Sequence, residues 1–251
     1  MRPGLAVVWP HGVGLVVLDE IDSTNEEARR RALAGAETPL WIRARRQVAG
    51  RGRQGRVWTE GDGNLYATLL MRPGMPASGS ALLSFAACIA VAEFFEAHGG
   101  RAALKWPNDP LLGCGKAAGV LLESAGRAGK LDWLAIGVGV NLVSAPAADG
   151  ASSHPPTSLL EEAGVRVSAE DALTSIAARL AYWASLLAAE GFAPIREAWL
   201  ARAARLGERI EARTPRENVT GVFEDVDVEG ALVLGTANGR RRIHAADIYF
   251  R

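Results

Sequence analysis

Cysteine is scarce in this chain of 251 residues, which holds only Cys88 and Cys114. Two cysteines are too few for a disulfide framework or a four-cysteine zinc site. The four histidines do not have the spacing of metal ligands, and neither an HExxH sequence nor a GxSxG nucleophile elbow is present. These absences argue against the common zinc and serine hydrolases, and they leave the ligands of any metal unknown.

Lysine is nearly absent, although the chain has 28 basic residues. Only Lys105, Lys116 and Lys130 are lysines, and all other basic residues are arginine. A compact ammonium on a flexible stem differs physically from a flat guanidinium. Each lysine is therefore a candidate for a task that arginine cannot perform, although for Lys130 chance retention on the surface is the simpler interpretation.

Net charge and long apolar runs are also missing. The 28 basic and 28 acidic residues balance, which excludes the globally basic surface of a nucleic-acid coat but permits a local basic site. The most apolar stretch, 81–95, is too short and too polar to span a bilayer. Pro10 stops the N-terminal apolar run, which does not have the form of a signal peptide. We expect a cytoplasmic protein without a membrane segment.

Strand and helix patterns alternate over residues 1–205, which predicts an α/β or α+β fold. Strands are expected at 5–21 with a break at 10–14, 39–44, 64–71, 102–106, 119–123 and 131–142. Helices are expected at 22–33, 80–98, 169–189 and 194–205.

The patterns change at residue 206. Short strands at 207–212, 219–224, 232–234 and 242–245 are separated by turn sequences, including the hairpin signal Asn238-Gly239. We therefore predict two domains, 1–205 and 206–251, of which the second is a small β-barrel.

The segment 43–63 is a loop of unusual composition, since it has five glycines and no apolar periodicity. Six arginines and no acidic residue lie between Arg43 and Arg56. Guanidinium groups and glycine-exposed amides both bind oxyanions, so we expect this loop to be mobile when empty and to order around a phosphate. A solvated basic loop and an arginine–glycine RNA-binding patch remain alternatives.

Three further motifs carry polar residues at strand ends. Residues 105–109 read Lys-Trp-Pro-Asn-Asp, residues 113–119 place Lys116 before a buried strand, and residues 137–141 form a glycine-spaced strand that ends in an asparagine. A buried ammonium needs an anionic partner, and glycines in a strand mark the close approach of another group. Each motif also has a purely structural alternative. Residues 105–109 could form a surface Asx turn, Lys116 could be a hairpin lysine in solvent, and residues 137–141 could be a twisted interior strand.

Taken in order, these motifs resemble one family, the biotin–protein ligases. The resemblance runs from about residue 15 to the C-terminus, and the arginine–glycine loop together with Lys-Trp-Pro-Asn-Asp is its most specific part. Its segments are Asp22-Ser23-Thr24-Asn25, Gln47 with 50–56 and Trp58, 63–66, 105–109, 116–123, 137–141 and 157–159.

The resemblance implies a mixed sheet flanked by helices, akin to the cores of class II aminoacyl-tRNA synthetases, with an SH3-like C-terminal barrel. It implies that biotin and MgATP form biotinyl-5′-AMP, and that the biotinyl group moves to one lysine of a biotin carboxyl carrier protein, a subunit of acetyl-CoA carboxylase. The oligomeric state stays open, a homodimer included.

The resemblance also assigns site residues. Lys116, Arg53 and Asp109 are implied to be catalytic, with Lys116 between the biotin carboxylate and the α-phosphate and Asp109 near the incoming lysine. Residues implied to bind biotin are Ser23, Thr24, Asn25, Gln47, Gly50, Arg51, Gly52, Arg53, Lys116 and Gly119. Residues implied to bind ATP or the adenylate are Arg51, Arg53, Arg56, Trp58, Lys105, Asn108, Lys116 and Asn141. Trp58 is expected to stack on adenine.

This sequence departs from many relatives in two ways. Too few residues precede Asp22 to form the N-terminal DNA-binding domain that many relatives carry, so we expect a monofunctional ligase that binds no DNA. Gly115 stands where many relatives have arginine. A lipoate–protein ligase of the same superfamily and a non-enzymatic nucleic-acid-binding protein that uses the arginine loop are the competing interpretations.

Overall fold

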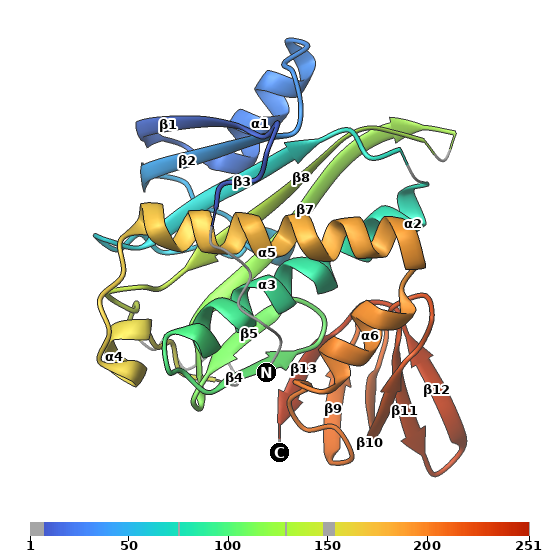
Figure 1. Ribbon diagram of the computed structural model, residues 1–251. Helices are drawn as coiled ribbons and strands as arrows, with labels where there is room; N and C mark the ends of the chain where they lie inside the picture. Colours follow the sequence, from blue (N-terminus) through green and yellow to red (C-terminus); the bar gives the residue numbers. More distant parts are fainter. Residues whose placement is uncertain (1–7, 75, 129, 148–153, 251) are drawn as a thin grey trace.

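The computed structural model describes residues 8–74, 76–128, 130–147 and 154–250. A mixed sheet with helices on both faces forms the larger part of the molecule, and a second, antiparallel sheet stands beside it (Figure 1). The predicted fold class is confirmed.

The central sheet has five strands in the order β1-β2-β3-β8-β7. Their bounds are Gly14–Ile21 (β1), Leu40–Gln47 (β2), Leu65–Met71 (β3), Lys130–Val140 (β8) and Ala118–Arg127 (β7). β1 pairs in parallel with β2, and the other neighbours are antiparallel. All residues of β3 except Met71 are buried, because side chains cover both faces of the sheet.

Two long helices cover one face of this sheet, and a third covers the other (Figure 1). α3 (Leu83–Ala97) and α5 (Ala169–Glu190) pack against each other within the main apolar core. α1 (Thr24–Leu33) forms a separate apolar cluster on the opposite face, with Trp133 among its members. Two helical stretches, Ala77–Ala97 and Ala169–Glu190, are long and apolar enough for a membrane span, but here they form the protein core.

A small antiparallel sheet carries the two motifs rich in polar residues. Its strands are β4 (Ala102–Lys105), β5 (Asp109–Leu112) and β6 (Gly115–Lys116). The hairpin between β4 and β5 sets Lys105 opposite Asp109, and the turn after β5 brings Lys116 alongside. The chain then enters β7 of the central sheet.

The C-terminal sheet has the order β12-β11-β10-β9-β13. Its strands are β9 (Arg209–Arg213), β10 (Asn218–Val226), β11 (Leu232–Thr236), β12 (Gly239–Ile243) and β13 (Asp247–Phe250). β13 pairs with β9 and is the strand of this sheet that lies next to the small sheet of β4 and β5 (Figure 1). The Trp106 indole donates to the Gly230 carbonyl at 3.0 Å and so joins the two parts.

The structure departs from the sequence-based expectations mainly in short elements. The patterns did not predict α4 (Leu159–Ala163), β5, β6 or β13, each of which has five residues or fewer. The expected helix 80–98 is divided at Leu82 into α2 (Ala77–Ala81) and α3, and α6 (Ala193–Leu200) ends earlier than expected because turns follow it. The first strand begins at Gly14, and expected strand residues 5–7 lie outside the described residues.

Candidate active site

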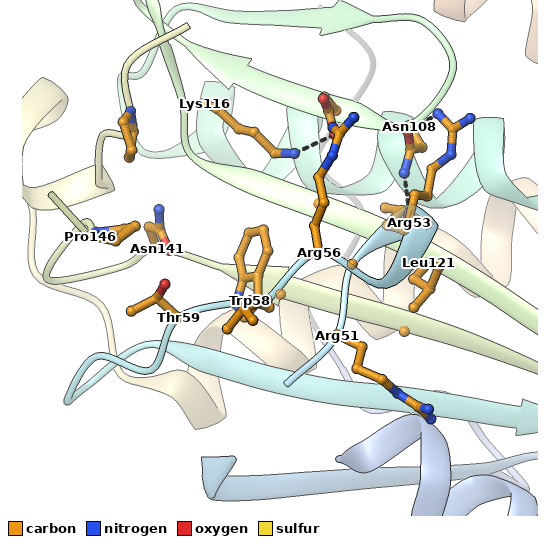
Figure 2. A pocket seen from close by; sticks show the side chains of 18 of the residues that line it. Arg51, Arg53, Arg56, Trp58, Thr59, Asn108, Lys116, Leu121, Asn141 and Pro146 are labelled. Carbon is orange, nitrogen blue, oxygen red and sulfur yellow. Dashed lines mark hydrogen bonds and ion pairs between the residues drawn. The ribbon is translucent and has the colours of Figure 1, made fainter. Parts of the chain in front are cut away.

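A cavity of about 440 Å³ lies over one end of the central sheet. Its walls come from the start of α1, the loop between β2 and β3, the strands β7 and β8, the hairpins of the small sheet and strand β13. Figure 2 shows three arginines of the loop, Trp58 and Lys116 around this space. The volume is that of a typical small-molecule site.

Buried neutral polar groups form one end of the cavity. The Gln47 side-chain oxygen accepts hydrogen bonds from the backbone N–H (2.7 Å) and the hydroxyl (2.9 Å) of Thr24. The Thr68 hydroxyl lies 2.8 Å from the Thr24 hydroxyl and 2.6 Å from Asn25 Oδ1. Asn25 Nδ2 donates to Glu123 at 2.7 Å. Because Gln47, Thr24, Asn25 and Thr68 are all buried, this end is suited to a ligand with complementary hydrogen-bonding groups.

The arginine loop closes over the cavity as an ordered hairpin. Backbone hydrogen bonds run from Gly52 N–H to the Arg56 carbonyl (2.7 Å) and from Trp58 N–H to the Gly50 carbonyl (2.9 Å). Arg53 lies in a short 3-10 helix, Arg53–Gly55, and donates to the Asn108 side chain at 3.0 Å. The mobility of the empty loop stays a prediction, and Asn108 is a partner that holds Arg53 in this arrangement.

The Trp58 indole lies against two glycines of the sheet. Gly119 on β7 and Gly139 on β8 are register partners, and a Cβ atom on them would lie 3.0 Å and 2.7 Å from the indole ring. Within the described residues, the buried Trp58 Nε1 has no hydrogen-bond partner. The predicted close approach at the glycine-spaced strand is therefore made by an aromatic side chain that walls the cavity (Figure 2).

Lys116 has the anionic partner that its position predicts. Its Nζ lies 2.7 Å from Asp109 Oδ1, and the two side chains are 30% and 20% exposed. The Lys116 backbone N–H donates to the Pro155 carbonyl at 2.8 Å, which fixes the strand that carries it. The ammonium also lies 5.9 Å from the centre of the Trp58 ring. The Lys116 ammonium therefore lies between Asp109 and the Trp58 indole that walls the cavity.

A smaller polar cavity adjoins the first and is lined by four cationic side chains, those of Arg53, Arg56, Lys105 and Lys116. Burial lowers the pKa of Lys105. Asp109 and Asp247 supply the acidic groups of this space. An arrangement of several cations around two carboxylates is suited to an anion such as a phosphate chain.

Asp247, Tyr249 and His154 are among the residues of the main cavity that the sequence reasoning missed. Asp247 and Tyr249 come from β13 of the C-terminal sheet, and Arg56 of the loop forms an ion pair with Asp247. The sequence has no signal for this pair, because its members are 191 positions apart. His154 also lines the cavity, and burial together with nearby Lys105 lowers its pKa to about 4.

The comparisons with known proteins agree over nearly the whole chain. The sequence model of the biotin/lipoate A/B protein ligase family matches residues 17–141, and that of the biotin protein ligase C terminal domain matches residues 206–251. The chain is 46% identical over 239 residues to a biotin–[acetyl-CoA-carboxylase] ligase of Paracoccus denitrificans, covering 93% of this chain and 99% of that protein. The chain belongs to the biotin–protein ligase family.

Other relatives in this family extend the comparison. The bifunctional ligase/repressor BirA of Bacillus subtilis is 31% identical, and the match covers 94% of this chain and 74% of BirA. A structure of biotin protein ligase from Aquifex aeolicus in complex with biotin and ATP superposes with a TM-score of 0.81 at 25% identity, covering 95% of this chain and 98% of that one.

Most residues to which the ligase resemblance gave a role lie together in the main cavity. Its lining includes Ser23, Thr24, Asn25, Gln47, Arg51, Gly52, Arg53, Arg56, Trp58, Asn108, Asp109, Lys116, Gly119 and Asn141. Lys105 lies instead in the adjoining cavity. Gly50 is not among the lining residues, but a Cβ there would lie 2.7 Å from the Trp58 carbonyl oxygen, so glycine lets the two sides of the loop approach.

Proposed function

We infer that this protein activates biotin with ATP and transfers the biotinyl group to a lysine of a biotin carboxyl carrier protein. The similarity to the Paracoccus ligase along nearly its entire length is the observation that carries this conclusion. The cavity supports it, because a neutral hydrogen-bonding end and a cationic end are combined in one space. Biotin has matching parts, a polar ureido head and a carboxylate.

For the first half-reaction, we propose that the ureido group of biotin binds beside Ser23, Thr24 and Gln47, and that its carboxylate lies near Lys116. A carboxylate oxygen attacks the α-phosphorus of ATP, the bond from that phosphorus to the β-phosphate bridging oxygen breaks, and pyrophosphate leaves. Both reacting groups are anionic, so the ammonium of Lys116 lowers their repulsion at the point of attack.

For the second half-reaction, the amine of the carrier lysine attacks the acyl carbon and AMP leaves. We propose that Asp109 orients this amine or takes its proton. Asp109 and Lys116 form an ion pair, so the lysine holds the carboxylate in place. Until the carrier arrives, the arginine loop with Arg53 would keep water from the acyl-adenylate.

The nucleotide is assigned to the cationic side of the site. We propose that Arg51, Arg53, Arg56, Lys105 and Asn108 contact its phosphates, and that Trp58 and Asn141 contact the nucleoside. Magnesium would enter with ATP. Among the described residues, no group of three or more His, Cys, Asp or Glu side chains gathers to hold a metal ion. Mg²⁺ is commonly bound through substrate phosphates with only one or two carboxylates, so a larger cluster of protein ligands is not required.

The remaining assignments are proposals that rest on the family. We propose that residues 1–205 form the catalytic domain and residues 206–251 an SH3-like domain, that the protein acts in the cytoplasm, and that it binds no nucleic acid. A homodimer stays a proposal to be tested by sedimentation.

The experiment that tests the function is incubation of the protein with biotin, MgATP and a purified carrier domain, followed by an avidin blot. Biotinylation of one carrier lysine that requires ATP is expected. Parallel reactions with lipoate distinguish a lipoate ligase, and titration with RNA and DNA at two salt concentrations distinguishes a nucleic-acid-binding protein. Transfer of lipoate without transfer of biotin would contradict the proposal.

A further inference from the structure

Glu123 lies on β7 beside the cavity, but it is not among the described residues that line it. Its two carboxylate oxygens reach residues that do. Oε2 accepts a hydrogen bond from Asn25 Nδ2 at 2.7 Å, and Oε1 lies 3.9 Å from Arg51 Nη2. Glu123 therefore joins the polar end of the cavity to the arginine loop.

From this geometry we propose that Glu123 is a positioning residue for biotin. It fixes the orientation of the Asn25 amide, and with it the donor and the acceptor that this cavity-lining residue offers beside Thr24 and Gln47. The inference rests on the proposed function, because it specifies how the same site selects the ureido head.

The first step concerns the space around Asn25. A Cβ at Gly137 would lie 2.3 Å from Asn25 Oδ1 and 3.1 Å from Asn25 Nδ2, so the amide lies close against β8 and glycine is required there. Asn25 is 5% exposed. The freedom left to such an enclosed amide is the flip that exchanges its oxygen and nitrogen, which are nearly equal in size.

The second step concerns the choice between the two flips. An ionised carboxylate only accepts hydrogen bonds, so Glu123 requires the Asn25 NH₂ group on its side and Oδ1 on the side of Thr68. The Leu121 carbonyl, 3.4 Å from Asn25 Nδ2, favours the same orientation. Without Glu123, this longer contact alone would select it.

The third step carries the orientation to the ligand. Asn25 itself lines the cavity, so the flip that Glu123 selects decides on which side a ligand meets its amide oxygen and on which side its NH₂ group. Beside it, Thr24 holds the Gln47 oxygen through its backbone N–H and its hydroxyl. The Gln47 amide is thereby oriented with its oxygen toward Thr24, which leaves the NH₂ group as the donor end of this cavity-lining residue.

Glu123 has a second contact, with Arg51, and the chain offers a matched control for it. Glu26 also pairs with Arg51, at the shorter distance of 3.1 Å, and no hydrogen bond joins it to Asn25 among the described residues. Replacing Glu26, on α1, by alanine therefore removes a carboxylate that contacts Arg51 of the loop, while the Asn25 orientation stays intact. Glu123→Gln makes the complementary change, since an amide oxygen still accepts from Asn25 but the charge facing Arg51 is lost.

The test is calorimetric titration of the full chain with biotin in the absence of ATP, together with thermal denaturation of each ligand-free variant. We expect Glu123→Ala to raise the Kd for biotin about tenfold or more, because oriented hydrogen bonds to the ligand are lost. Glu123→Gln and Glu26→Ala are expected to stay within a factor of about three of the parent. The melting temperature should be the same for Glu123→Ala and Glu26→Ala, since both residues are partly exposed.

Three results would overturn the inference. The first is a Kd for biotin in Glu123→Ala equal to that of the parent. The second is an equal loss of affinity in Glu26→Ala, which would place the effect in Arg51. The third is a loss of affinity in Glu123→Ala that accompanies a lower melting temperature and is not rescued by Glu123→Gln. Failure of the parent protein to bind biotin would instead contradict the proposed function, so the two failures are distinguishable.

Discussion

The replacement of Lys116 by alanine tests the electrostatic basis of the proposed adenylation. The change removes an ammonium that lies 2.7 Å from Asp109 and borders both cavities. At a separation of about 4 Å and an effective dielectric constant of about 20, one ion pair is worth about 4 kcal/mol. Because the Lys116 side chain is 30% exposed, solvent screens part of this energy. We therefore expect a loss of about 2–4 kcal/mol in the transition state, or roughly 30- to 1000-fold in rate.

A second replacement separates the loss of the Lys116 ammonium from the repulsion by the unpaired Asp109 carboxylate. In the Lys116→Ala variant, the Asp109 carboxylate has lost its ammonium partner. The unpaired carboxylate then repels the incoming anionic substrates. Adding Asp109→Ala removes that repulsion, so adenylation in the double variant should recover about tenfold relative to Lys116→Ala. The matched control is Lys130→Ala, because Lys130 is an exposed lysine at the start of β8 and does not line either cavity.

The assay is single-turnover release of pyrophosphate from ATP in the presence of saturating biotin, before any carrier domain is added. This reads adenylation without the transfer step. Release by Lys116→Ala at the parent rate would refute the electrostatic reasoning. An equal loss in Lys130→Ala would also refute it, since the effect would then not depend on the position of the charge.

Three other changes give independent tests. Arg53→Gly removes the 3.0 Å hydrogen bond to Asn108, so the acyl-adenylate should escape and biotinylate unrelated lysines; a mass-spectrometric count equal to that of the parent would contradict this. Asp247→Asn releases Arg56 for the phosphates, so KM for ATP should fall, and a higher KM would contradict this. The free energy of unfolding should change by less than about 1 kcal/mol, because the Arg56 and Asp247 side chains are 58% and 23% exposed. Burial in the folded protein lowers the pKa of His154 from its ordinary value of 6.5 to about 4, so the native state favours the neutral ring. Stability should therefore decrease as the pH falls from 6.5 toward 4. Denaturant unfolding should show a smaller decrease over this range in His154→Asn, and an equal decrease would contradict the assignment.

Long elements with a clear period could be predicted from the sequence. The expected helix 169–189 is α5, Ala169–Glu190, and the expected strand 131–142 is β8, Lys130–Val140. Such segments bury one face or both faces along many residues, so their composition records their environment. Short elements such as β6, with two residues, and β13, with four, contain too few positions for a pattern. They form because tertiary neighbours provide the pairing strand.

The site was predictable where its residues act as local motifs. The arginine loop and the segment 105–109 stand out because several unusual residues are adjacent in the chain. Local motifs gave no role to Glu123, His154 or Asp247. Glu123 meets Asn25 across 98 positions and Asp247 meets Arg56 across 191, and local composition carries no record of such contacts.

The sequence by itself determined the family, the fold class and the kinds of side chain that the chemistry needs, because these depend on local order and spacing. The tertiary structure alone decided which charges and hydrogen-bonding groups meet. Lys116 is paired with Asp109, Arg56 with Asp247 from the C-terminal sheet, and Asn25 with Glu123. The physical reason is that electrostatic and hydrogen-bond energies depend on distances of a few ångströms, which are set by the packing of strands and loops that lie far apart along the chain.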